Sequence, residues 1–199
     1  MGIAFACALS MTSCGAKSRQ ASGDSGSAAV AVSVTDTASA IVPVYAKGYT
    51  VKYLPGNVRL VDIRDPQKEE GNTFRYALVP KGAKPAAIPD GYTVIETPVK
   101  HAICMTSLQL SNFIRLDACD YVAGITSTRH LFNKEMKERL KSGKTSKIGI
   151  EGNFDNEVIM SINPDVIFIS PFKRGGYDAM RETGIPLVPH LGYKEMTPL

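Results

Sequence analysis

The sequence predicts a doubly wound α/β fold: a lobe with a mainly parallel five-stranded sheet, preceded by a small antiparallel N-terminal β appendage. Three features lead to this prediction. Short uninterrupted apolar runs, such as residues 166–169, are typical of parallel strands buried on both faces. Segments with apolar residues at helical spacing, such as 155–162, alternate with these runs. Residues that end helices follow, Pro164 after one segment and Gly184 after another, so the chain repeats a strand–helix–strand unit.

The beginning of the sequence predicts a leader and a tether. Residues 1–13 carry no charge and end in small residues before Cys14. This pattern is typical of a lipoprotein signal peptide over residues 1–14, in which Cys14 receives the lipid; a plain secretory signal is the alternative. Residues 15–47 are rich in Ser, Ala, Gly and Thr. That composition predicts a flexible tether with a reach of roughly 30 Å.

Residues 48–98 predict the β appendage. Two strand-like segments, 58–63 and 73–79, are joined by a polar loop, which is the pattern of a hairpin. A connection rich in Pro and Gly, 81–90, leads to a third strand at 92–96.

Residues 99–193 predict the lobe itself. Its strands are expected at 101–105, 121–125, 147–150, 166–169 and 186–188. Its helices are expected at 107–116, 131–140, 155–162 and 177–183. The second of these helices is strongly charged, with Glu135/Arg139 and Lys134/Glu138 at i,i+4 spacing.

Composition narrows the classes of function. The net charge of +4 comes from interspersed charges of both signs, which does not favour a nucleic-acid partner. No apolar run reaches the roughly 20 residues that a membrane-spanning helix needs. Cys104 and Cys119 are either buried thiols that behave as small hydrophobic residues or a disulfide, which an exported location permits. No Cys/His spacing of a metal site occurs, so we expect no bound metal and no cofactor.

The loops that follow the predicted strands are the candidate ligand site. The carboxyl ends of parallel strands converge on one rim, and ligands of such sheets bind there. Hydroxyls, an amide, a cation and aromatic rings on this rim suit a large amphipathic ligand with anionic groups. The candidate ligand-binding residues are Thr106, Ser107, Ser127, Arg129, Asn153, Phe172 and Tyr193.

Each candidate also has a structural explanation. Thr106 or Ser107 either contacts ligand or caps the helix that begins near Leu108. Arg129 is either a ligand contact or a solvated surface residue. Phe172 and Tyr193 either line the site or pack against neighbouring segments. His190 lacks a predictable second metal ligand, so its expected role is not metal binding.

The sequence does not predict an enzyme. It contains no G-x-S-x-G elbow, no Walker loop and no G-x-G-x-x-G after a strand. A basic Gly pair at 173–176 is only a weak phosphate signal. The acidic pairs Asp62/Asp65 and Asp117/Asp120 fall in turn-like sequence, where Asp caps the backbone.

Four segments carry a resemblance to a known family. They are GNFDNEVIMSINPDVIFIS from Gly152, TPVKHAICMTS from Thr97, LDACDYVAGIT from Leu116 and YKEMTPL from Tyr193. In this order and spacing they resemble the periplasmic binding proteins of ABC importers for metal chelates and cobalamin, whose two lobes are joined by one long helix. The resemblance spans residues 92–199.

This resemblance implies the function that we expect. The chain would hold the N-terminal lobe, residues 194–199 would begin the inter-lobe helix, and the second lobe would be absent because the chain is a fragment or comes from a truncated gene. A monomer, lipid-anchored in the periplasm of the cell envelope, would capture a ferric siderophore, haem or cobalamin and deliver it to an ABC permease. The alternatives are a surface lipoprotein that uses the lobe to contact a protein and, third, an enzyme with a flavodoxin-like lobe. The ligand and the membrane leaflet are not specified by the sequence.

Overall fold

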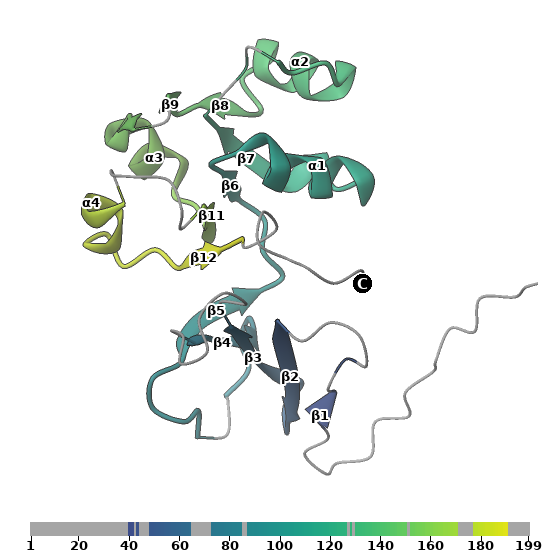
Figure 1. The fold of residues 1–199 in the computed structure, drawn as a ribbon, viewed down its shortest axis with the longest axis vertical. Helices are drawn as coiled ribbons and strands as arrows, with labels where there is room; N and C mark the ends of the chain where they lie inside the picture. The colour runs from purple at the N-terminus through teal and green to yellow at the C-terminus, as the bar shows by residue number, and fades with distance from the viewer. Residues whose placement is uncertain are drawn as a thin grey trace, which may run out of the picture. The chain divides into compact units, whose positions relative to one another are not determined.

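The structure, a computed structural model, describes residues 40–41, 43, 48–64, 73–84, 87–126, 128, 130–150, 152–170 and 177–190. All of these residues belong to one compact unit, Thr35–Leu199. They form a mixed α/β fold with two five-stranded sheets, called sheet A and sheet B below (Figure 1).

Sheet A is the predicted β appendage. Its strands, in spatial order, are β1 (Ala40–Ile41), β2 (Tyr49–Leu54), β3 (Val58–Arg64), β4 (Thr73–Pro80) and β5 (Thr93–Thr97). The predicted hairpin of β3 and β4 is confirmed, and the pairs from β1 to β4 are all antiparallel. β5 pairs parallel to β4, so the expectation of a wholly antiparallel appendage is wrong. The connection between these two strands is long enough to return the chain to the beginning of β4, as parallel pairing requires.

A tight turn adds β2, which was not predicted, to this sheet. Gly56 and Asn57, between β2 and β3, both have positive φ, 79° and 58°. Two consecutive residues in this region match the right-handed twist of a hairpin, and Gly and Asn adopt it at the lowest steric cost.

Sheet B is the predicted five-stranded parallel lobe. Its strands are β6 (Ala102–Cys104), β7 (Val122–Ile125), β8 (Ser146–Lys147), β11 (Val166–Ile169) and β12 (Leu187–Pro189). Their spatial order is β12-β11-β6-β7-β8, and every neighbouring pair is parallel. The doubly wound α/β prediction is therefore confirmed.

The third predicted strand is shorter than expected. Only β8 pairs within sheet B, because the chain then leaves the sheet as β9 (Gly149–Ile150) and pairs antiparallel with β10 (Asn153–Phe154). Gly149 makes this departure possible. Its φ is +92°, and a Cβ there would lie 2.5 Å from the carbonyl oxygen of Asn153.

Helices cover both faces of sheet B. They are α1 (Ser107–Arg115), α2 (Lys134–Lys141), α3 (Asn156–Ile162) and α4 (Asp178–Arg181), and the 3₁₀ turn η1 (Cys119–Tyr121) precedes β7. Leu110 of α1 and Met136 of α2 pack in one apolar cluster with β6 and β7. Ile159 of α3 and Met180 of α4 pack in another, on the opposite face (Figure 1). No helix within the described ranges is long and apolar enough to span a membrane.

Local sequence signals set the ends of these helices. Asn133 and Asp155 cap α2 and α3, since their side-chain oxygens accept hydrogen bonds from Met136 N and Val158 N. α3 ends at Asn163, which has a left-handed φ of 48° directly before Pro164. This is the stop that the sequence predicts.

A shared core and polar contacts join the two sheets. Tyr76 and Ile95 of sheet A pack in one buried cluster with Ala102 and Val166 of sheet B. The Asp165 carboxylate accepts hydrogen bonds from the backbone N–H of Lys100 (2.7 Å) and of His101 (2.8 Å). It also pairs with Lys81 Nζ at 3.3 Å, which ties the end of β4 to the loop before β11.

Candidate functional site

The strand order of sheet B defines where a ligand site is expected. From β6 the chain proceeds through β7 to β8 on one side, and then crosses to β11 and β12 on the other. The order therefore reverses between β6 and β11. In open α/β sheets the loops at the carboxyl ends of these two strands diverge at this switch point and leave a crevice for ligands.

Thr106 lies at this point as a helix cap. Its side chain is 8% exposed, and its Oγ1 accepts a hydrogen bond from Gln109 N at 3.5 Å. Gln109 Oε1 accepts one in return from Thr106 N at 3.0 Å, which completes a capping box. The capping explanation for Thr106 is therefore confirmed. Ser107, the first residue of α1, is exposed at the rim.

Two buried polar atoms flank the switch point. Ser170 follows β11 and is 1% exposed, and Gln109 in the first turn of α1 is 2% exposed. Ser170 Oγ and Gln109 Nε2 have no hydrogen-bond partner among the residues that the structure describes. An unsatisfied buried donor costs about 1–3 kcal/mol, so each such atom calls for an explanation, of which a ligand or an ordered water is one. Gln109 Nε2 only donates, so a group that satisfies it carries an acceptor, whereas Ser170 Oγ can donate or accept.

Register places the two loops side by side. Cys104 of β6 is paired with Phe168 of β11, and Thr106 and Ser170 each lie two residues beyond that pair. Thr126, directly after β7, donates from its Oγ1 to the carbonyl of Met105 at 2.8 Å. This bond fixes the loop after β6 against the end of β7.

His190 lies on the β12 side of the rim that the strand ends form. It follows β12, and its Nε2 lies 3.1 Å from Asn112 Nδ2 on α1. With this orientation of the Asn112 amide, its nitrogen donates and the neutral imidazole accepts through Nε2. Burial lowers the pKa of His190, which favours this neutral form. The pair thereby joins α1 to the end of β12, on the side of the rim where β11 lies.

The outer edge of sheet B carries a separate open hollow of about 560 Å³. Its lining residues are Thr128, Leu140, Gly143, Thr145, Ser146, Lys147 and Val158. They belong to β8 and its surroundings, two strands away from the switch point. The hollow is wide open to solvent, and the polar atoms described above do not line it.

The predicted site residues are only partly brought together. Thr106 and Ser107 lie at the switch point, whereas Asn153 lies exposed in the β9–β10 hairpin beyond β8. Ser127, Arg129, Phe172, Tyr193 and the predicted lipid acceptor Cys14 lie outside the described residues. Their assignments stay predictions.

Sequence reasoning missed Gln109 and Asn112. Gln109 lies three residues after the Thr106 cap, and Asn112 lies three residues further along α1. The Thr-x-x-Gln pattern at 106–109 is the sequence signal of a capping box, which could have placed Gln109 at the start of the helix.

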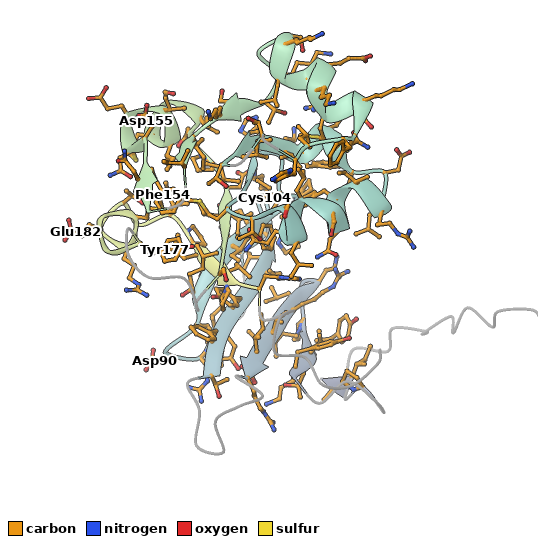
Figure 2. The ribbon with its side chains drawn as sticks, turned by 45° about the horizontal axis from the view of Figure 1, so that its top comes forward. Asp90, Cys104, Phe154, Asp155, Tyr177 and Glu182 are labelled. Carbon is orange, nitrogen blue, oxygen red and sulfur yellow. The ribbon has the colours of Figure 1, made fainter. Side chains whose placement is uncertain are left out.

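An aromatic pair supports the loops on the α3/α4 face. The Phe154 and Tyr177 rings are stacked, with centroids 5.7 Å apart and planes 20° apart (Figure 2). Tyr177 is buried and belongs to the apolar cluster under α3 and α4. The pair therefore anchors the β9–β10 hairpin to the body of the lobe.

Neither a metal cluster nor a disulfide is found in the part of the chain that the structure describes. No three His, Cys, Asp or Glu side chains group there in a way that could hold a metal ion. Cys104, in the middle of sheet B (Figure 2), and Cys119 are both free and buried, as the thiol interpretation predicts.

Comparison with known proteins finds partial similarities in sequence and in structure. No protein-family model matches it. An uncharacterized lipoprotein of Methanocaldococcus jannaschii is 26% identical over 179 residues, which cover 78% of this chain and 42% of that protein.

Two solved structures are similar over part of their length. The petrobactin-binding protein YclQ of Bacillus subtilis matches with a TM-score of 0.38 and 16% identity, over 65% of this chain and 37% of that one. A periplasmic binding protein of Veillonella parvula matches with a TM-score of 0.37 and 18% identity, over 61% and 36%. The matched part is thus less than half of each of these solved chains.

Proposed function

We propose that this chain is a ligand-binding lobe of a substrate-binding lipoprotein that captures a ferric chelate, haem or cobalamin for an ABC permease. One observation carries the proposal: the strand order of sheet B reverses between β6 and β11, and buried unpaired polar atoms of Gln109 and Ser170 flank that point. The chain acts in this proposal by binding, not by catalysis.

The sequence resemblance supports the choice of ligand class. Its TPVKHAICMTS segment includes β6 and its GNFDNEVIMSINPDVIFIS segment includes α3 and β11, so the resembling residues build the two sides of the switch point. An oxygen-rich chelate or a carboxylate-bearing macrocycle would supply the acceptors that Ser170 Oγ and Gln109 Nε2 lack.

A binding titration tests the proposal directly. The chain has eight Tyr and no Trp, so its Tyr emission can report on ligands. Across a panel of ferric siderophores, haem and cobalamin, we expect one class to give saturable quenching, checked by calorimetry because these ligands absorb light. Ser170→Ala should weaken that binding about tenfold, the equivalent of roughly 1.4 kcal/mol.

A matched control separates the site from the fold. Ser161→Ala removes a hydroxyl that donates to Val158 O on the exposed side of α3, and it should leave the affinity unchanged. If the wild type binds no ligand of the panel, the alternative function is favoured, a surface lipoprotein that contacts a protein partner.

The lipid anchor is the second part of the proposal. The uncharged segment before Cys14 supports it, as does the similarity to a protein described as a lipoprotein. Cys14→Ser should move the protein from the detergent phase to the aqueous phase in the native host. Unchanged membrane association of the variant would contradict lipidation at Cys14.

A further inference from the structure

The net charge of the chain is concentrated on one element. Residues 134–147 contain six Lys and Arg and two Glu, a net charge of +4, and the net charge of the whole chain is also +4. The rest of the chain is thus neutral as a sum. This segment is α2 together with the turn into β8.

The lysines of this segment form one exposed stripe. Lys134, Lys137 and Lys141 are exposed and follow each other at i, i+3 and i+7, so they share a helix face. The opposite face packs on sheet B through Met136, which is fully buried. We call the three lysines, with Lys144 at the end of the helix and Phe132 at its beginning, the α2 basic surface.

Carboxylates do not neutralise this surface. None of the ion pairs among the described residues involves Lys134, Lys137 or Lys141. Arg139, the one arginine of the segment, is 9% exposed and pairs with the exposed carboxylate of Asp120. Glu135 and Glu138 of α2 are also exposed, but they offset at most two of the four lysine charges.

An exposed aromatic ring lies within the same surface. Phe132 is 79% exposed, the most exposed of the large hydrophobic residues described. Lys137 Nζ lies 5.9 Å from the centre of its ring. A phenyl ring beside solvated lysines is the combination with which peripheral helices bind the headgroup region of anionic bilayers.

We propose that the α2 basic surface docks on an anionic membrane surface, with the lysines at lipid phosphates and Phe132 in the headgroup region. The alternative anionic partner is an acidic protein. Protein interfaces, however, are depleted in Lys and enriched in Arg, and here the arginine is buried while the lysines are exposed. This inference does not depend on which ligand, if any, binds at the switch point.

Vesicle sedimentation tests the proposal on the full chain carrying Cys14→Ser, so that no lipid anchor contributes. We expect at least tenfold more binding to phosphatidylcholine vesicles with 30% phosphatidylglycerol than to pure phosphatidylcholine, lost in high salt because salt screens these charges. The triple variant K134E/K137E/K141E should lose that preference. K52E/K84E/K100E changes the net charge equally at exposed lysines elsewhere and should keep it.

Fluorescence supplies a readout that net charge alone cannot produce. Because the chain has no Trp, Phe132→Trp introduces a single indole. Its emission should shift to the blue on anionic vesicles, whereas Leu116→Trp, a control at another exposed apolar position, should not shift. Thermal melts show that each variant is folded.

Three results would overturn the proposal. One is the absence of any preference of the wild type for anionic vesicles, which would leave an acidic protein as the partner that the lysines fit. The second is equal loss of binding in both triple variants, which would mean that net charge alone attracts the protein. The third is an unshifted emission of Phe132→Trp on vesicles that bind the protein.

Discussion

Tyr76 of β4 donates a hydrogen bond from its phenolic oxygen to the carbonyl of Leu187 in β12, at 2.6 Å. The two residues are 111 positions apart, and each belongs to a different sheet. Burial of the Tyr76 ring raises its pKa, so the hydroxyl remains a donor at every physiological pH. This contact couples sheet A to the outer strand of sheet B.

Tyr76→Phe should lower the free energy of unfolding by about 1 kcal/mol, the net value of one hydrogen bond, because the ring and its packing remain. Urea denaturation followed by circular dichroism measures the change. Tyr121→Phe, at a half-exposed position, is the control and should have no effect. Equal stability of Tyr76→Phe and the wild type would show that the sheets are joined by apolar packing alone.

Asp165 makes the second set of contacts between the sheets, and its carboxylate predicts that the fold loses stability in acid. Partial burial raises the pKa of the Asp165 carboxyl. Hydrogen bonds from Lys100 N, His101 N and Lys81 lower this pKa by a larger amount, so it lies below its usual value. A depressed carboxyl pKa contributes stability that is present above about pH 4 and is lost as the pH falls below that value.

Asp165→Asn should therefore cost about 1–2 kcal/mol at pH 7 and progressively less below pH 4. Chemical denaturation at pH 7 and at pH 3 measures the difference in the free energy of unfolding between variant and wild type. Asp155→Asn is the comparison, since it caps α3 away from the contacts between the sheets. A cost that is the same at pH 7 and pH 3 would contradict a role for the charge.

The sequence predicted most of sheet B because the relevant signals are local. Apolar runs mark β6, β7, β11 and β12, and Asn163-Pro164 marks the end of α3. The direction of β5 was predicted wrongly, because parallel and antiparallel pairing depend on the path of a connection and not on the strand residues.

Side-chain contacts between distant parts of the chain, and the candidate site with them, were less predictable for a related reason. Arg139 has Glu135 at i−4, a spacing that suggests a pair along the helix, but it pairs with Asp120, which is 19 positions away. Likewise, nothing in the sequence around Gln109 or Ser170 signals a buried unpaired atom, because burial at the switch point results from the strand order.

Arg139 leads to a third prediction. Its guanidinium donates to the Asp120 carboxylate, to Asp120 O at 3.1 Å and to Thr145 Oγ1 at 3.4 Å. Arg139→Lys keeps the charge but loses the fork geometry, so we expect a loss of about 2 kcal/mol in thermal or urea unfolding. Arg115→Lys, on the exposed end of α1, should be neutral. Wild-type stability of Arg139→Lys would mean that a point charge suffices.

The two thiols of the lobe predict a labelling experiment. Burial raises the pKa of Cys104 to about 12, and the pKa of Cys119 is raised first by burial and then by Glu135. In a Cys7→Ser/Cys14→Ser protein at pH 8, both thiols should react slowly with Ellman's reagent in the native state, since the thiolate is the nucleophile. Both should react at once in urea. No reactive thiol in urea would show that oxidation had joined them.

His190 leads to the last prediction, which concerns pH near neutrality. Burial lowers the pKa of its imidazole, so the unfolded chain binds the proton more readily than the folded one. Stability is then complete above about pH 6.5 and falls as the pH drops through that value. Protonation also removes the Nε2 lone pair that faces Asn112 Nδ2. His190→Gln keeps an acceptor without the titration, so its stability should decline less than that of the wild type between pH 7.5 and 5.5, as measured by urea midpoints.

His130→Gln, at an exposed position, should follow the wild type. If all three proteins lose the same stability over this range, His190 does not link the fold of the rim to pH.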